Sequence, residues 1–371
     1  MRKIINCLII MGFILLLISC NVPSIKQTLP DTVVDPFVQP DVPETNNNAN
    51  DRHETNIEKD TVSPIIGSLT HGFKDKSLTN EYGLRHIYSG EEMHINYSIA
   101  MSGNISDAGV GIMLFLDGKP QPYKILDDNT YKYMHTFSGA TRVEPELIFV
   151  PVTGQKGDSL ELFAITFVKP DYFPGDIMAG NVQSNSALAT RTQLEFEESP
   201  PEYKYPETPE RLITYSIQYE DISSKISNTQ TSKSIYYNLS VNGQSESSQV
   251  INPCVIYNMT KLQSLNCEFE MYGSTEPEYC LIFFVNHEPI SILSEKEIII
   301  RNKNGQKLTV EAIINMSDFD GEAIVYAVVA TRNSRFVSDD ISGNIWADAT
   351  STFYISSSPT YEEMIENHRN K

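Results

Sequence analysis

Carboxylates are the most abundant reactive groups in this sequence, with 48 acidic residues against 28 basic ones. The best candidate for a cation site, Asp318-Phe319-Asp320-Gly321-Glu322, sets two aspartates one residue apart beside a turn-forming glycine. Such oxygens are the ligands that Ca²⁺ prefers, but an EF-hand needs a third oxygen ligand before its glycine and a glutamate about six residues after it. Both are absent, and the comparable turn Gln155-Lys156-Gly157-Asp158 carries a lysine. We therefore interpret the run as a hairpin loop and predict no metal site.

The sequence contains no motif for histidine-based catalysis or for nucleotide binding. The sequence has no G-x-S-x-G elbow, P-loop, H-E-x-x-H pair or glycine-rich dinucleotide turn. The closest two of its seven histidines are His86 and His94. If Ile95 and Ile99 face a core, His94 faces water, because alternate strand residues point to opposite sides. We predict no catalytic residue, no cofactor and no enzyme, with a hydrolase that uses paired carboxylates as an alternative.

Aromatic residues could bind sugars. A cluster in the first half contains Tyr123, Tyr131, Tyr133 and Phe137, while the single tryptophan, Trp346, is expected in a core near the start of a strand. Tyr172-Phe173-Pro174-Gly175 is matched in the second half by Arg335-Phe336-Val337-Ser338, so the phenylalanine is shared and the preceding residue is free to differ. Tyr172 is therefore our candidate ligand-binding residue.

Five cysteines occur, namely Cys7, Cys20, Cys254, Cys267 and Cys280. If the last two flank a tight hairpin centred near Thr275, Cys280 lies opposite Glu270, too far from Cys267 for a disulfide. Cys254 would then be the only partner for either thiol. We predict mostly free thiols that act as small buried apolar groups.

The N-terminus resembles that of bacterial lipoproteins. Arg2 and Lys3 precede an apolar run from Ile4 to Ile18, and Leu17-Ile18-Ser19-Cys20 is similar to a lipobox. The resemblance implies that residues 1–19 are a signal peptide, that a signal peptidase cuts before Cys20, and that its thiol receives a diacylglyceryl group. It places the mature protein on the cell membrane or outer membrane, facing away from the cytoplasm, with the membrane as a partner through the lipid.

Two segments interrupt the folded part of the chain. Residues 20–64 have few large apolar side chains and cannot offset the entropy of ordering, so they are predicted to be a disordered tether. Its root-mean-square span would be about 35 Å. Residues 199–210 contain four prolines and repeated acids, which predicts a semi-rigid interdomain linker without regular pairing. Residues 359–371 form a tail with a hint of a short helix.

An internal duplication organises the remainder. Ile95, Tyr97, Ile99, Met101 and Gly103 match Leu265, Cys267, Phe269, Met271 and Gly273 at one constant offset, and Phe163-Ala164-Ile165 matches Tyr326-Ala327-Val328. Apolar and polar residues alternate over short runs in both halves, which is typical of strands, and the nearly continuous apolar run at 323–330 predicts a central strand. The sequence thus predicts an all-β protein with two tandem β-sandwich domains, residues 65–198 and 211–358. They loosely resemble immunoglobulin-like or fibronectin-type modules by strand number and size. Cys267 shares its strand face with Leu265 and Phe269 and should point inward.

Charge limits the partners. The formal net charge is −20, and signal-peptide removal takes away two basic residues and no acid. Such a surface repels nucleic acid and anionic headgroups, favours cations or basic peptides, and disfavours self-association. The sequence therefore predicts a lipid-anchored, non-catalytic envelope protein that presents two sandwiches to an unknown protein or glycan partner. A carbohydrate-binding module is the second hypothesis and would show tyrosines stacked along one exposed face.

Overall fold

The structure is a computed structural model that describes residues 67–74, 79–80, 83–171, 188–202, 205, 207–223, 235–245, 255–257, 263–275, 277–291, 295–317, 319, 322–332 and 346–356. Cys20, Tyr172, Cys254, the expected tether and the C-terminal tail lie outside these ranges. The described residues all belong to one compact unit. Their regular structure consists of strands and one short helix, α2 (Ile105–Ala108), so the all-β prediction is confirmed.

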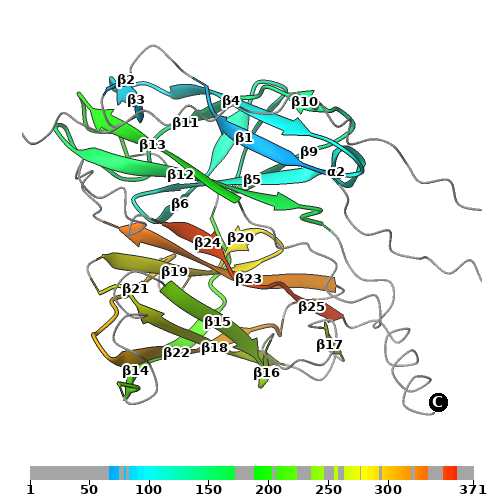
Figure 1. Cartoon of the computed structure of the whole chain (residues 1–371), viewed down its shortest axis with the longest axis vertical. Helices are drawn as coiled ribbons and strands as arrows, with labels where there is room; N and C mark the ends of the chain where they lie inside the picture. The colour runs from blue at the N-terminus through cyan, green and yellow to red at the C-terminus, as the bar shows by residue number, and fades with distance from the viewer. Residues whose placement is uncertain are drawn as a thin grey trace, which may run out of the picture. The chain divides into compact units, whose positions relative to one another are not determined.

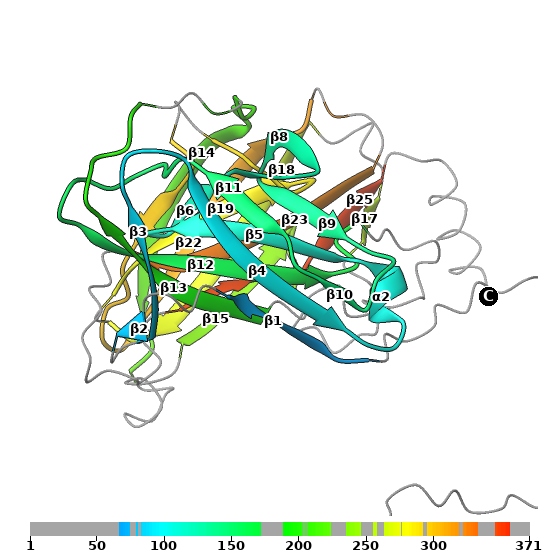
Figure 2. The same cartoon turned by 90° about the horizontal axis from the view of Figure 1, so that it is seen from above.

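The first sandwich has two sheets (Figure 1). Its outer sheet contains β1 (Leu69–Phe73), β4 (Met93–Met101), β11 (Glu146–Phe149), β7 (Tyr123–Ile125), β8 (Asp128–Lys132) and β10 (Arg142–Val143). Its inner sheet contains β2 (Thr79–Asn80), β3 (Gly83–Tyr88), β13 (Leu188–Phe196), β12 (Ser159–Val168), β5 (Val110–Leu116), β6 (Lys119–Gln121) and β9 (Met134–Phe137). Figure 2 looks onto β1, β4 and β11 of the outer sheet.

The second sandwich repeats this plan. Its outer sheet contains β14 (Leu212–Asp221), β22 (Gln306–Asn315), β18 (Ser264–Gly273), β15 (Ile235–Val241) and β16 (Gln244–Ser245). Its inner sheet contains β17 (Val255–Tyr257), β25 (Phe353–Ser356), β23 (Glu322–Arg332), β19 (Glu278–Val285), β20 (Glu288–Pro289), β21 (Ile298–Ile300) and β24 (Ala347–Ala349). Each inner sheet holds one parallel pair, β3–β13 or β17–β25, and this shared irregularity supports the duplication.

Strand patterns follow from the position of each sheet. Along β4 and β18, buried residues alternate with more exposed ones, because one face packs on the sandwich core and the other meets water. Every residue of β5 is buried, and β23 is buried except at its two ends, because the inner sheets are covered on both faces. The near-continuous apolar run at 323–330 thus lies on a central strand, as its composition predicted.

A third apolar core joins the two sandwiches. It lies between the inner sheets, and we call it the interface core. Its residues are Met113, Phe115, Tyr133, Met134, Phe163, Ile165 and Phe167 of the first sandwich and Cys280, Ile282, Phe284, Ile324, Tyr326, Val328, Ala330, Ala347, Ala349 and Tyr354 of the second. Each sandwich also has its own core between its two sheets. Whether residues 65–198 and 211–358 fold as independent domains stays a prediction.

Two expectations about local pairing are wrong. The strands on either side of the acidic run at 318–322, β22 and β23, belong to different sheets and so do not form the expected hairpin, while Asp318, Asp320 and Gly321 lie outside the described residues. The same holds for β18 and β19, which were expected to flank a hairpin near Thr275. In both places the chain crosses from one sheet of the sandwich to the other. Alternation within a strand defines its faces, but it does not tell which strand becomes its neighbour.

Candidate functional site

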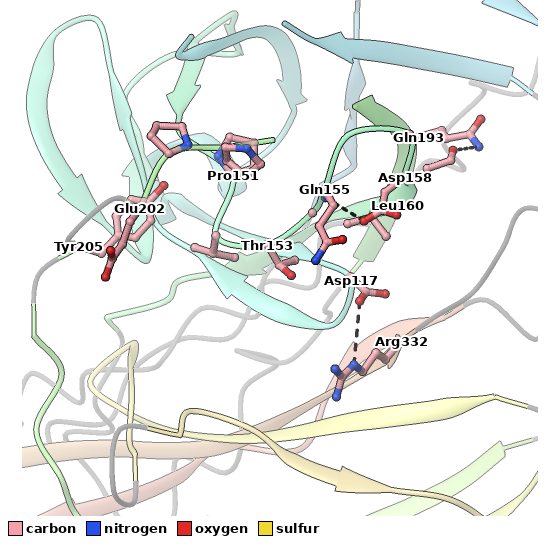
Figure 3. Close-up of a pocket in the computed structure, with 16 residues that line it drawn as sticks. Asp117, Pro151, Thr153, Gln155, Asp158, Leu160, Gln193, Glu202, Tyr205 and Arg332 are labelled. Carbon is pink, nitrogen blue, oxygen red and sulfur yellow. Dashed lines mark hydrogen bonds and ion pairs between the residues drawn. The ribbon is translucent and has the colours of Figure 1, made fainter. Parts of the chain in front are cut away.

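A cleft opens where the two sandwiches and the linker meet. Its volume is about 1160 Å³, and its walls come from the loop before β12, from the linker and from the end of β23. Figure 3 shows Asp117 and Arg332 pointing toward each other, with 3.9 Å between Asp117 Oδ2 and Arg332 Nε. A second hollow of about 1200 Å³ also uses Val152, Tyr205 and Arg332, so the two hollows adjoin.

The linker is anchored beside this cleft. Gln121, which is fully buried, donates from Nε2 to the Tyr205 hydroxyl at 3.2 Å, and the rings of Tyr131 and Tyr205 lie 5.5 Å apart. Glu210 and Ser291 form an isolated bridge. The described linker residues belong to no strand of either sandwich, which agrees with their proline content. The cleft is therefore bounded by a segment that is held to the first sandwich at Tyr205 and to the second at Glu210.

A hydrolase would need two converging carboxyls with separated pKa values. Burial raises the pKa of Glu161 to about 7, against a weaker opposing effect of Arg191. Burial also raises the pKa of Asp348, which accepts a hydrogen bond from the Tyr237 hydroxyl at 2.8 Å. Glu161 lies on the face of β12 that carries Phe163 toward the interface core, whereas Asp348 lies on the face of β24 opposite to that of its neighbours in this core. The two carboxyls therefore point away from a common site.

A different hollow crosses the outer face of the second sandwich. We call it the outer groove; its volume is about 610 Å³ and it runs over β14, β22, β18 and β15. Most of its lining side chains are hydroxyls, amides and carboxylates, namely Thr214, Ser216, Asn238, Ser240, Asn266, Glu268, Glu270 and Glu311, and Tyr215 and Ile313 also line it. A groove with this lining suits a ligand that offers several hydrogen-bond donors.

The strand register aligns four groove residues in one row. Ser216 lies opposite Glu311, Glu311 opposite Glu268, and Glu268 opposite Ser240. Two carboxylates thus face each other across β18 and β22, an arrangement that destabilises a sheet. Gln218 Nε2 donates to Glu311 Oε2 at 3.2 Å, but neither glutamate forms an ion pair with a lysine, arginine or histidine of the described residues. The row is a local concentration of negative charge.

Two tyrosines stand on the same outer face. Tyr236 of β15 lies opposite Tyr272 of β18, and their rings are stacked with centroids 4.8 Å apart. Tyr236 is 40% exposed. Next to this pair, Lys307 donates to Glu270 and forms an ion pair with Glu220 at 3.4 Å. Aromatic rings and polar groups are therefore combined on one sheet.

The aromatic cluster of the first sandwich is not such a platform. Tyr123 is fully buried and donates to the carbonyl of Ile112, and Tyr133 faces the second sandwich, where Lys296 donates to its hydroxyl. Trp346 packs against the core of the second sandwich, as expected. His94 is exposed and 3.1 Å from Glu146, as its strand face predicted. No group of three metal-binding side chains occurs among the described residues.

The described cysteines lie in separate cores. Cys267 points into the core of the second sandwich, which confirms its predicted face, and Cys280 lies in the interface core. Both are free, and burial raises the pKa of each thiol to about 12. Thiolates are the reactive form, so both side chains are structural groups.

Comparisons with known proteins give no family. No family model matches the chain, and no curated protein matches it. Among solved structures, the Salmonella enterica SafA pilin in complex with the SafB chaperone is 10% identical with a TM-score of 0.22, over 79% of this chain and 97% of that one. The Streptococcus agalactiae AgI/II polypeptide BspA C-terminal domain is 8% identical with a TM-score of 0.19, over 78% and 100%.

A third similar structure is a putative membrane anchored protein from Corynebacterium diphtheriae. It is 8% identical with a TM-score of 0.19, over 80% of this chain and 60% of that one. In the part of this chain that the structure describes, there is no helix of the length and hydrophobicity that crossing a bilayer requires.

Proposed function

We propose that the chain is a lipid-anchored, non-catalytic protein of the bacterial envelope that binds a protein partner in the outer groove. The partner would present lysine or arginine side chains. The single observation behind this proposal is the row Ser216, Glu311, Glu268 and Ser240, in which two carboxylates face each other with no basic partner in the part of the chain that the structure describes. A cationic side chain between them would relieve the repulsion and donate hydrogen bonds to both carboxylates.

The anchor would hold this groove away from the membrane. Cys20 would carry the acyl chains, and residues 21–64 would span about 35 Å as a flexible coil. Changing Cys20 to Ala should leave unprocessed precursor without an acyl label. Normal processing and lipid labelling of that variant would exclude the anchor.

The binding site can be tested by removing charge. The full-length Glu268→Gln/Glu311→Gln variant should lose the partner that the parent chain captures by chemical cross-linking in its native envelope. A matched control, Glu91→Gln/Glu197→Gln, removes the same charge from exposed positions of the first sandwich and should retain capture. Equal loss in both variants would indicate a general charge effect, and equal retention would exclude the groove.

Glycan binding is the second candidate, and the stacked pair Tyr236 and Tyr272 favours it. Exposed aromatic rings beside amides and carboxylates can contact sugar rings and their hydroxyls. Tyr236→Ala should then abolish binding of oligosaccharides isolated from the envelope, while Tyr219→Ala, at an exposed tyrosine of β14 outside the groove lining, should not. If the ligand is instead a basic protein, Glu268→Gln/Glu311→Gln should reduce binding more than Tyr236→Ala does.

A further inference from the structure

We propose that β14 is an assembly edge, at which two copies of this chain pair their β14 strands antiparallel about Ser216. The inference goes beyond the proposed function, because it concerns the free edge of the sheet rather than the ligand in its groove. Strand β14 ends the outer sheet of the second sandwich, and among the described strands only β22 pairs with it. An edge strand presents unpaired N–H and C=O groups along its open side.

The side chains of β14 are unusually apolar for an open edge. Ile213, Tyr215, Ile217 and Tyr219 are exposed to 52%, 38%, 37% and 36%. Tyr215, Ile217 and Tyr219 pair with Ala312, Val310 and Leu308, which are buried in the core of the second sandwich. These side chains therefore lie on the core-facing side of the sheet. The core does not extend as far as the edge strand, so they remain partly exposed. No lysine, proline or acid interrupts the strand from Ile213 to Tyr219.

The strand is complementary to itself. In an antiparallel pair with Ser216 opposite Ser216 of the second copy, Tyr215 lies opposite Ile217, and Thr214 opposite Gln218. Tyr219 approaches Ile213, near the register shift between Leu212 and Thr214. Aromatic residues opposite β-branched ones are favourable cross-strand pairs. A two-fold contact makes each such pair twice, which is the property of an isologous interface.

Charge at the strand ends fits the same arrangement. Arg211 precedes β14, and Glu220 and Asp221 end it. Antiparallel pairing brings the basic start of one strand to the acidic end of the other. The net charge of −20 opposes association at long range, but charges more than about 8 Å apart are largely screened at physiological ionic strength. The contact surface therefore decides whether two copies pair.

A register-specific cross-link tests this proposal. Ser216→Cys in the full chain, oxidised mildly in native membranes, should shift the protein to a band of about twice its mass. The Cα atoms of opposed residues in antiparallel strands lie about 5 Å apart, within the range of a disulfide. Gln218→Cys is the matched control, because it lies on the same face of β14 and also loses a hydrogen bond to Glu311. The two cysteines at position 218 would be about 14 Å apart, so Gln218→Cys should give no more cross-linked product than the parent chain does.

Further outcomes keep the proposal falsifiable. Adding Ile217→Lys to Ser216→Cys should remove the cross-link, because a charge on the apolar side opposes edge pairing. Equal cross-linking of Ser216→Cys and Gln218→Cys would show random collision and overturn the register. Absence of the Ser216→Cys band in a correctly folded chain would overturn the pairing. Cross-linking of Ser216→Cys to a different protein would do the same, because it would assign the edge to another partner strand.

Discussion

The two sandwiches close the same edge of their outer sheets in different ways. In the first, β11 is flanked by the β7–β8 hairpin, whose outermost strand carries Asp128 and Lys132, paired at 2.6 Å. In the second, the equivalent strand β22 is flanked by β14, whose middle is uncharged and apolar on one side. β7 and β8 lie in the middle of the first copy, between β6 and β9, whereas β14 is the first strand of the second copy. Charged edges resist pairing with other chains, so the two copies differ in the property that governs assembly.

The inner sheets are alike in backbone and differ in chemistry. The amide of Asp117 donates to the carbonyl of Glu161 in the first copy, and the amide of Asn286 donates to that of Ile324 in the second. Glu161 and Ile324 are therefore equivalent positions, and both are buried. Phe115 and Phe284 are also equivalent, and their rings contact each other with centroids 6.1 Å apart. The two copies thus pack through the same strands, as the halves of a symmetric dimer do.

The largest expected effect comes from the centre of this contact. Phe284→Ala should destabilise the protein by about 3–5 kcal/mol, because a fully buried ring stacked on Tyr326 is lost and a cavity remains. Urea unfolding of the full chain measures this change. If the two sandwiches pack as described, Phe115→Ala and Phe284→Ala together should cost less than the sum of the two single changes. Strict additivity would contradict their contact.

The difference between Glu161 and Ile324 predicts a pH effect. Neither carboxylate oxygen of Glu161 has a hydrogen-bond partner among the described residues, and burial raises its pKa from 4.5 to about 7. A pKa raised in the folded state means that the stabilisation is complete below about pH 4.5 and is lost as pH rises through about 7. The loss should approach about 3 kcal/mol at pH 8.

The variant Glu161→Gln isolates this group. Its urea midpoint should change less between pH 5 and pH 8 than that of the parent chain, and it should be the more stable protein at pH 8. Glu146→Gln, at a half-buried glutamate of the outer sheet, serves as control and should keep the pH dependence. An unchanged pH profile in Glu161→Gln would show that this carboxyl is not the titrating group.

The sequence predicted those structural features that depend only on residues close together along one strand. Alternation in 264–273 placed Cys267 inward, and hence Glu268 outward, and the long apolar run at 323–330 predicted a central strand. Pairing between distant strands was not predictable, because alternation defines faces and leaves neighbours open. The opposition of Glu268 and Glu311 depends on such a pairing, so the outer groove was missed. The interface core was missed because strands covered on both faces do not indicate what covers them. The roles of Cys20 and Tyr172 stay predictions.

A smaller effect tests how closely the sandwiches approach. Gly118 has a φ of +78°, and a Cβ there would lie 2.8 Å from Cys280 Sγ and 3.2 Å from the Thr331 carbonyl oxygen of the other sandwich. Gly243 has a φ of +77° with nothing within 4 Å of such a Cβ. Both changes to Ala cost backbone strain of about 1 kcal/mol, and Gly118→Ala should cost about 1–3 kcal/mol more. Equal urea midpoints for the two variants would argue against close packing at Cys280.

The smallest expected effect concerns one strand position that the copies fill differently. Tyr97 of β4 is buried with its hydroxyl 2.5 Å from His71 Nδ1, while the matching residue of β18 is Cys267. The register places His71 beside Ile99 and Leu239 beside Phe269, so the second copy has the apolar Leu239 where the first has a hydrogen-bonding ring.

A hydroxyl at position 267 would therefore lack the side-chain partner that His71 provides to Tyr97. We expect Cys267→Ser to cost about 1–2 kcal/mol of unfolding free energy, because a buried hydroxyl without a partner loses its hydration. Cys267→Ala, which removes the sulfur without adding a polar group, should cost less, and urea midpoints of the two variants decide between them. If the Cys267→Ser variant proves as stable as Cys267→Ala, the surroundings of position 267 must supply a hydrogen-bond acceptor. Both copies would then be able to satisfy a hydroxyl at this strand position.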